Sequence, residues 1–275
     1  MNQETIGKLD KFFGAFVGAP KPLLLLDYDG TLAPFCLDRF RAFPWPGVRE
    51  RIERIQKQGR TRIVMVSGRP AAEVAPLIGL EQPLEVWGLH GGERLYPDGR
   101  RELEQLPPQT RARLDQLRQQ LNHDSFGGLF EDKANGAVMH WRSASPEQAK
   151  HIEQQTRALF EPLAELDGLK LLKFEAGLEL RAGRDKGDAI EAILKEAALD
   201  DPRASNPVSF LGDDVTDEDA LRSINRAQGP HLSVLVRQQW RETAADVWLR
   251  PPDELLEFLD SWIKADRAQQ PTPGS

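Results

Sequence analysis

Five short runs of mostly apolar residues recur along the chain. Such runs are typical of strands that are buried on both faces of a parallel sheet. Helix-like stretches separate several of the runs, which predicts an α/β fold with parallel strands. The predicted strands are Leu23–Leu26, Ile63–Val66, Leu84–Trp87, Val208–Leu211 and Leu232–Val236, and the predicted helices include Pro46–Gln58, Asp188–Ala198 and Asp217–Asn225.

The middle of the chain has a different pattern, with turn signals between short strand-like segments. Asn135-Gly136 and Ala176-Gly177 each separate two such segments, as in hairpins. The four segments are Leu129–Lys133, Ala137–Arg142, Lys170–Glu175 and Leu178–Ala182. Hairpins imply antiparallel pairing, so we expect an α/β domain at 107–184, inserted into a core made of 1–106 and 185–275.

Small and polar residues follow directly after the predicted core strands. In an open α/β sheet, ligands bind outside the carboxyl ends of the strands. The repetition at successive strands therefore predicts a binding site at that edge. The residues concerned are Asp27, Ser67, the segment Gly88-Leu89-His90-Gly91, Asp213 and Arg237.

The first candidate motif is Asp27-Tyr28-Asp29-Gly30-Thr31. Asp27 at the strand end is suited to act as a nucleophile or a metal ligand, and Asp29 to give a proton to a leaving oxygen and later take one from water. Gly30 permits the turn that brings both acids together. Taken alone, the motif is equally consistent with an acidic turn. A calcium loop is disfavoured by Thr31 and the preceding strand.

Two further elements are suited to hold a phosphoryl group. Ser67 follows a predicted strand and can donate to a phosphoryl oxygen, helped by N–H groups of its turn. Lys186, beside Gly187 at a helix start, can neutralise phosphate and an aspartate together. Taken alone, Ser67 is better explained as a helix N-cap and Lys186 as a solvated surface lysine.

The last candidate motif is a dense group of acids after the strand that ends at Leu211. Neighbouring carboxylates repel one another unless a cation lies among them, and oxygen ligands suit Mg²⁺. The helix macrodipole alone explains acids inside the following helix, but it does not explain Asp213 and Asp214 before it.

The order of these four motifs resembles that of the haloacid dehalogenase (HAD) superfamily of phosphatases. The last motif fits approximately, since Asp217 falls three residues after Asp214 rather than four. The resemblance implies a HAD-like Rossmannoid core, and the insertion resembles a cap domain of the C2 type that determines substrate specificity.

A closer resemblance is to the trehalose-6-phosphate phosphatases. It rests on Gly88-Leu89-His90-Gly91, on Glu131-Asp132-Lys133 followed by His140-Trp141-Arg142, and on Gly177–Arg181 leading to Lys186-Gly187. One departure is Ala33–Leu37, where that family often has a more polar run.

The resemblance implies a Mg²⁺-dependent hydrolysis of trehalose 6-phosphate through an aspartyl phosphate on Asp27. The implied catalytic residues are Asp27, Asp29, Ser67 and Lys186; the implied metal ligands are Asp27, Asp29 through its backbone carbonyl, Asp213, Asp214 and Asp217; the implied substrate-binding residues are Arg69, His90, Glu131, Lys133, His140, Arg142, Glu179 and Arg181.

The composition of the chain limits the classes of binding partner that we expect, but it does not bear on the reaction. The net charge of −7 argues against a nucleic-acid partner. Cys36 is the single cysteine, and no signal-like or membrane-spanning run is present, so we expect a cytoplasmic protein with no membrane partner and no obligate protein partner. Two alternatives stay open: a phosphatase for sucrose phosphate or a glucosylglycerol-type phosphate, and a sugar phosphomutase. A noncatalytic binding module is disfavoured, because it predicts that one of Asp27, Asp29, Lys186 or Asp213 is replaced, and none is.

Overall fold

A computed structural model describes residues 1, 3–36, 38–123, 129–141, 144–165, 168–174, 177–200 and 205–267. The chain divides into two compact units: a core unit, Met1–Arg101 with Asp185–Ser275, and an inserted unit, Glu102–Arg184. The first boundary falls after Arg101 rather than after residue 106. One reason is that Glu104 accepts a hydrogen bond from the backbone N–H of Arg184 at 3.0 Å, which ties the two connecting segments together.

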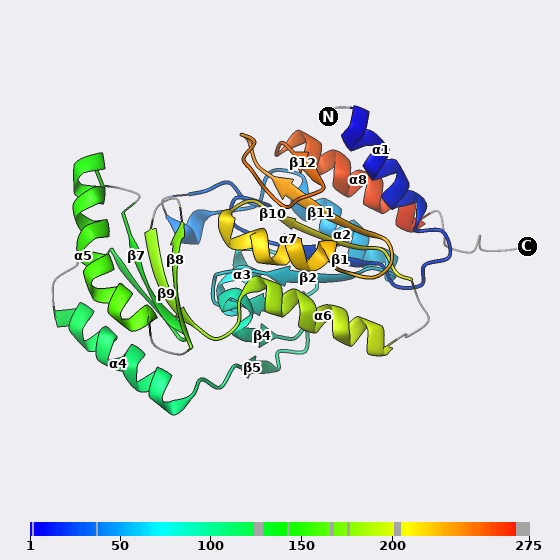
Figure 1. Cartoon of the computed structure of the whole chain (residues 1–275). Coiled ribbons are helices and arrows are strands. Elements are labelled where there is room, and N and C mark those ends of the chain that lie inside the picture. Colours follow the sequence, from blue (N-terminus) through cyan, green and yellow to red (C-terminus); the bar gives the residue numbers. More distant parts are fainter. Residues whose placement is uncertain are drawn as a thin grey trace, which may run out of the picture. The chain divides into compact units, whose positions relative to one another are not determined.

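The core unit is built on a long, mostly parallel sheet (Figure 1). All five predicted strands are present, and β3 begins one residue later than the sequence suggested. The sheet order is β12 (Val247–Leu249), β11 (His231–Val236), β10 (Val208–Gly212), β1 (Leu23–Leu26), β2 (Arg62–Val66), β3 (Glu85–Gly88), β4 (Glu93–Leu95) and β5 (Arg101–Leu103). The strands from β12 to β3 are parallel, and β4 is antiparallel to β3. The predicted α/β class is therefore confirmed.

Helices cover both faces of the core sheet. Leu24 and Leu26 of β1 point into one apolar cluster, and Leu23 and Leu25 point into another. Burial on both sides explains why β1 shows no alternation of polar and apolar residues. The first cluster is closed by α1 (Gln3–Gly14), α2 (Val48–Gln58), α3 (Ala71–Ile78) and α8 (Asp253–Arg267), and the second by α6 (Lys186–Asp200) and α7 (Glu218–Asn225). None of the helices within the described residues is long and apolar enough to cross a membrane.

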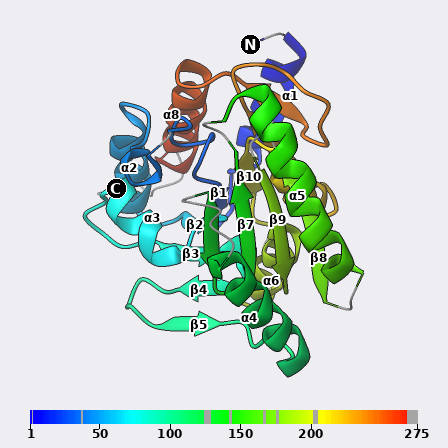
Figure 2. The same ribbon diagram turned by 90° about the vertical axis from the view of Figure 1, so that its left-hand side faces the viewer.

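The inserted unit is a separate four-stranded antiparallel sheet with two helices (Figure 2). Both predicted hairpins are confirmed. The order is β6 (Phe130–Lys133), β7 (Gly136–His140), β9 (Gly177–Ala182) and β8 (Leu169–Phe174), and the helices are α4 (Pro108–His123) and α5 (Pro146–Ala164). Ser145 caps α5 and accepts from the N–H of Gln148, whose side chain accepts from Ser145 in return.

Side chains alternate across the inserted sheet. Ala137 and Met139 of β7, with Leu178 and Leu180 of β9, pack in the same apolar cluster as residues of α4 and α5. Because successive strand residues point to opposite faces, the residues between them form the other face. That face carries Glu131, Lys133, Val138, His140, Glu179 and Arg181.

Candidate active site

The candidate active site of the core unit lies at the carboxyl ends of four neighbouring strands: β3, β2, β1 and β10. Asp27 follows β1, Ser67 follows β2 and Asp213 follows β10. His90 lies in the short 3-10 helix Leu89–Gly91 after β3. Motifs that are far apart in sequence therefore meet at one edge of the sheet, as such folds lead one to expect.

Asp27 is held by donors on both carboxylate oxygens. The Nζ of Lys186 lies 2.6 Å from Oδ1 of Asp27 and 2.6 Å from Oδ1 of Asp217. The hydroxyl of Thr31 donates to Oδ2 of Asp27 at 3.0 Å. The side chains of Asp27 and Lys186 are each 4% exposed, and that of Asp217 is 0% exposed. These contacts hold the side chain of Asp27 in one orientation at the carboxyl end of β1.

Asp213 joins this group without a hydrogen-bond donor to its carboxylate among the described residues. Asp27, Asp213 and Asp217 each offer one carboxylate oxygen, and the three oxygens lie within 4.8 Å of one another. A Cβ placed on Gly30, whose φ is +82°, would lie 2.1 Å from Oδ2 of Asp213. The turn after β1 therefore requires glycine for its backbone angle and for the close approach of Asp213. We call Asp27, Lys186, Asp213 and Asp217 the acid–lysine cluster.

Burial makes the charge of this cluster unfavourable. Burial raises the pKa of Asp27 to about 7; Lys186 opposes that rise and Asp217 adds to it. The pKa of Asp213 is also raised, first by burial and then by Asp27 and Asp217. Burial lowers the pKa of Lys186, but Asp217 and Asp27 more than offset this, so it is raised overall and the side chain stays charged. Three buried carboxylates around one ammonium group favour a further cation.

The donor set suits Mg²⁺, which prefers carboxylate and carbonyl oxygens. The carboxylate of Asp213 fits the role of a ligand best, because it receives no hydrogen bond from the described residues, and an oxygen of Asp27 lies within 4.8 Å of it. Asp217 is engaged differently. Its Oδ1 accepts from Lys186, and its Oδ2 accepts from the backbone N–H of both Asp213 and Asp214 at 3.0 Å. Asp217 thus holds both the ammonium group of Lys186 and the backbone of the turn at Asp213 and Asp214.

Asp214 lies outside the cluster of carboxylates. Its Oδ1 accepts from the N–H of Val215 at 2.7 Å, and it caps the 3-10 helix Val215–Asp217. The carboxylates that lie together are those of Asp213 and Asp217, which are four residues apart, whereas Asp214 and Asp217 are three apart.

Asp29 points to Arg69 rather than into the cluster. The Nε of Arg69 lies 2.5 Å from Oδ2 of Asp29, and Nη2 lies 2.6 Å from Oδ1. A third nitrogen of Arg69 donates to the carbonyl of Arg39 at 2.7 Å. Arg69, implied as a substrate contact by the family resemblance, is engaged with the protein in this structure.

Ser67 and His90 lie side by side in two neighbouring loops, one after β2 and the other after β3. The Oγ of Ser67 accepts from the N–H of Arg69 at 3.2 Å, and the carbonyl of Ser67 accepts from the N–H of His90 at 2.9 Å. A Cβ on Gly68 would lie 2.6 Å from the imidazole of His90. His90 itself has a φ of +58°, a conformation that costs energy outside glycine. Glycine at residue 68 therefore gives the ring its place beside Ser67.

The polar face of the inserted unit brings together five of the six predicted residues. The Nζ of Lys133 lies 3.0 Å from Oε1 of Glu179, and Nε2 of His140 lies 2.8 Å from Oε2 of Glu131. Arg181 approaches the other oxygen of Glu179 at 3.9 Å. The sixth predicted residue, Arg142, lies outside the described residues.

Two residues at the core site were not assigned by sequence. Thr31 contacts Asp27, and its place inside the first motif was the available signal. Arg241 donates to the carbonyls of Asp213 and Asp214, at 3.4 Å and 2.7 Å. No motif surrounds Arg241, so only the folded structure shows it.

Solved structures share this architecture. The C-terminal domain of trehalose-6-phosphate phosphatase from C. albicans has a TM-score of 0.78 at 20% identity, covering 93% of this chain and 96% of that one. A haloacid dehalogenase-like hydrolase from B. subtilis has a TM-score of 0.58 at 16% identity, covering 86% and 98%. The chain therefore has the same fold as these structures, with an acidic site at the carboxyl ends of its core strands.

Sequence comparison narrows this fold class to one family. Residues 25–250 match the trehalose-phosphatase family, so the chain belongs to that family. The trehalose-phosphate phosphatase of Mycobacterium marinum is 31% identical over 252 residues, which are 87% of this chain and 60% of that protein. The probable trehalose-phosphate phosphatase 3 of Oryza sativa is 30% identical over 261 residues, 88% of this chain and 69% of that protein. The chain thus spans about 60% of the length of the mycobacterial relative.

Proposed function

We propose that the chain hydrolyses trehalose 6-phosphate to trehalose and phosphate, with Asp27 as the nucleophile and Mg²⁺ as the cofactor. The observation that carries the proposal is the buried acid–lysine cluster at the end of β1. An aspartate fixed by Lys186 and Thr31 is an oriented nucleophile, and the ammonium group offsets charge as a phosphoryl group approaches. Membership of the trehalose-phosphatase family supports the choice of substrate.

The proposed reaction has two halves. In the first, a carboxylate oxygen of Asp27 bonds to phosphorus, the bond from phosphorus to the sugar oxygen breaks, and Asp29 protonates that oxygen. In the second, Asp29 takes a proton from water, which attacks the aspartyl phosphate and releases phosphate with Asp27 restored. The side chain of Asp29 is 29% exposed, which suits proton exchange with solvent and with substrate.

Mg²⁺ would be held by carboxylate oxygens of Asp27 and Asp213 and by the backbone carbonyl of Asp29. When bound, the ion supplies positive charge that stabilises the phosphoryl oxygens. Lys186 and Ser67 would hold the same oxygens from the protein side. Asp217 keeps Lys186 in place, because its Oδ1 accepts from that ammonium group at 2.6 Å.

The inserted unit would select the sugar. Its polar face presents paired carboxylate, ammonium and imidazole groups, which can donate to or accept from hydroxyls. Trehalose is uncharged and rich in hydroxyls, so a face of balanced ion pairs suits it better than a face of one sign. Contacts remote from phosphorus help to orient the reacting ester.

Phosphate release from a panel of esters tests the proposal. The panel contains trehalose 6-phosphate, sucrose phosphate, a glucosylglycerol phosphate and p-nitrophenyl phosphate, each assayed with Mg²⁺ and with EDTA. We expect the highest kcat/KM with trehalose 6-phosphate and no turnover in EDTA. Preference for another sugar ester would reassign the substrate. Transfer of phosphate to a second hydroxyl would indicate a phosphomutase, and no turnover of any ester would indicate a binding module.

A further inference from the structure

Arg241 joins two loops at the carboxyl edge of the core sheet. It lies in the loop 237–246 between β11 and β12, and its contacts reach the acidic turn after β10. The Nη2 of Arg241 donates to the carbonyl of Asp214 at 2.7 Å, and Nε donates more weakly to the carbonyl of Asp213 at 3.4 Å. The Nη1 lies 2.6 Å from Oε1 of Glu218, in the first turn of α7. One guanidinium group therefore contacts three residues of the segment that carries Asp213.

Glu218 closes the connection from the other side. Its Oε2 accepts from the backbone N–H of Ala244 at 2.9 Å, so both oxygens of Glu218 contact the loop 237–246. The side chain of Glu218 is 10% exposed and that of Arg241 is 18% exposed. A largely buried ion pair with added hydrogen bonds holds its geometry much better than a pair on the open surface.

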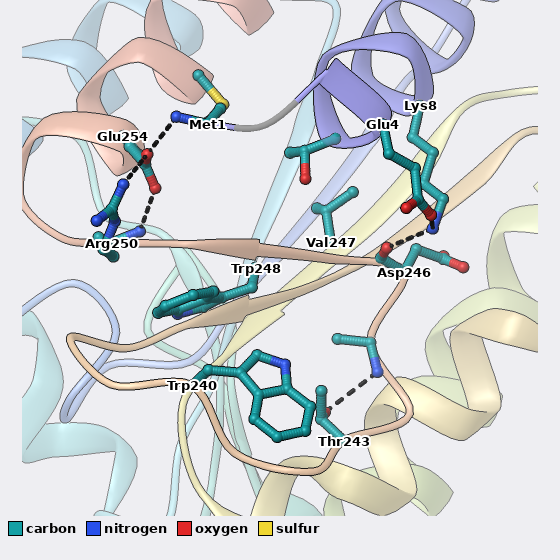
Figure 3. Close-up of a pocket in the computed structure, with 12 residues that line it drawn as sticks. Met1, Glu4, Lys8, Trp240, Thr243, Asp246, Val247, Trp248, Arg250 and Glu254 are labelled. Carbon is teal, nitrogen blue, oxygen red and sulfur yellow. Dashed lines mark hydrogen bonds and ion pairs between the residues drawn. The ribbon is translucent and has the colours of Figure 1, made fainter.

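The opposite side of the same loop is open. Trp240 is 61% exposed, and Trp240 and Thr243 line a pocket of about 360 Å³ with residues that include Trp248 and Glu4 (Figure 3). No residue from 237 to 246 is buried. Ala244 and Ala245 are partly buried against the second apolar cluster, and Asp246 exchanges hydrogen bonds with Ser233. Among the polar contacts of the loop, those of Arg241 and Glu218 join it to the acidic turn.

We propose that Arg241 is a positioning residue for the metal ligand Asp213. This inference rests on the proposed function, since it assumes that Asp213 binds Mg²⁺. The guanidinium group donates hydrogen bonds to the carbonyls of Asp213 and Asp214, and Asp217 accepts hydrogen bonds from the N–H groups of the same two residues. With both polar groups of the backbone held, the carboxylate of Asp213 is directed at the cluster.

Arginine suits this position because its planar fork contacts carbonyls and a carboxylate at once. A lysine has one ammonium centre on a flexible stem and cannot reproduce the fork. Groups that orient a metal ligand without touching the metal change affinity by roughly 10- to 100-fold when removed.

The test compares Arg241→Met and Arg241→Lys with Arg226→Met as a matched control. Arg226 lies just after α7, and its ion pair with Glu191 is on the surface, with the two side chains 62% and 59% exposed. Mg²⁺ binding to the full-length chain is measured by isothermal titration calorimetry, and Tm is recorded in EDTA. We expect Arg241→Met to weaken Mg²⁺ binding roughly 10- to 100-fold, Arg241→Lys to weaken it less, and Arg226→Met to match the parent.

Parent-like Mg²⁺ affinity in Arg241→Met would overturn the inference, whatever its Tm, because Arg241 would then serve stability alone. If Arg241→Met does not fold, Arg241→Lys decides: unchanged affinity overturns the inference and weaker affinity supports it. A parent chain that binds no Mg²⁺ would overturn it as well. Failure of the proposed function looks different: the parent would bind Mg²⁺ with its affinity dependent on Arg241, and yet release no phosphate from any ester.

Discussion

The two polar regions of this molecule differ in how their charges are balanced. In the core unit, three buried carboxylates surround Lys186, whose contacts to Asp27 and Asp217 are both 2.6 Å. In the inserted unit, charges form pairs, and the His140–Glu131 pair is 39% and 19% exposed. An excess of buried negative charge favours a metal cation, and the bound cation can in turn attract an anionic phosphoryl group. Balance on a strand face favours neutral hydroxyls. Under the proposed function, the reacting site would need an excess of negative charge, and the face that selects the sugar would need balanced charge.

The largest expected effect comes from removing the nucleophile. Asp27→Asn should lower kcat by a factor on the order of 10⁴ or more, as loss of a nucleophile does in other covalent enzymes. The protein should remain folded, because the substitution removes one of three crowded carboxylates. Phosphate release and a thermal melt measure both effects. Asp10→Asn, on the exposed side of α1, is the control. Substantial turnover by a verified Asp27→Asn sample would contradict the covalent mechanism.

The next largest effect is expected from removing the metal, which should distinguish the core unit from the inserted unit. In EDTA turnover should vanish, and Mg²⁺ at about one hundred times its dissociation constant should raise the free energy of unfolding by about 2.7 kcal/mol. Asp213→Asn should abolish that stabilisation, because it removes a carboxylate of the cluster. Glu131→Gln should leave it intact. Thermal melts with and without Mg²⁺ provide the measurement. Equal loss in both variants would show that the effect does not belong to the acid–lysine cluster.

A smaller, substrate-dependent effect is expected in the inserted unit. Lys133→Ala and Glu179→Ala should each lower kcat/KM for trehalose 6-phosphate by roughly 10- to 150-fold, the value of a charged hydrogen bond. Turnover of p-nitrophenyl phosphate should barely change, because that ester has no sugar. Lys173→Ala is the control, since this exposed lysine of β8 pairs with Glu153. A parallel fall on both esters would mean that the pair serves stability and not selection.

The smallest expected effect concerns Tyr28, whose side chain points away from those of its two neighbours in the first motif. Tyr28 lies between Asp27 and Asp29, yet its side chain is buried in the apolar cluster and donates to the carbonyl of Ala42 at 2.7 Å. Tyr28→Phe should lower the free energy of unfolding by about 1–3 kcal/mol, since it leaves that carbonyl without its donor. Chemical denaturation measures the loss. A large fall in kcat with no loss of stability would show that the hydroxyl serves catalysis.

Sequence predicted the core best where a motif coincided with an element boundary. Asp27, Ser67 and Asp213 directly follow buried strands, and Lys186 is the first residue of a helix. The fold therefore fixes the backbone position of each of these residues. Their directions were not predictable in the same way. Asp29 faces Arg69, and Asp214 caps a short helix, because partners from other elements compete for these carboxylates.

Other features left too little signal in the sequence. The three-residue strands β4 and β12 are shorter than any pattern can specify, and their pairing depends on the neighbouring strand. The inserted unit begins at Glu102 rather than after residue 106, because its boundary depends on contacts across the two connections. Arg241 belongs to no recognisable motif. The loop between β11 and β12 brings it to the acidic turn only in the folded protein.

The pairing of β1 with β10 has a consequence for the order in which the protein is made. Leu23 pairs with Val208 and Leu26 with Leu211, so one edge of β1 has no partner until the inserted unit and α6 have been synthesised. Until then β1 exposes an apolar strand edge, the kind that pairs wrongly with other chains. Such distant pairing also slows folding. We therefore expect chaperone dependence and aggregation of truncated chains to be set by the arrival of β10.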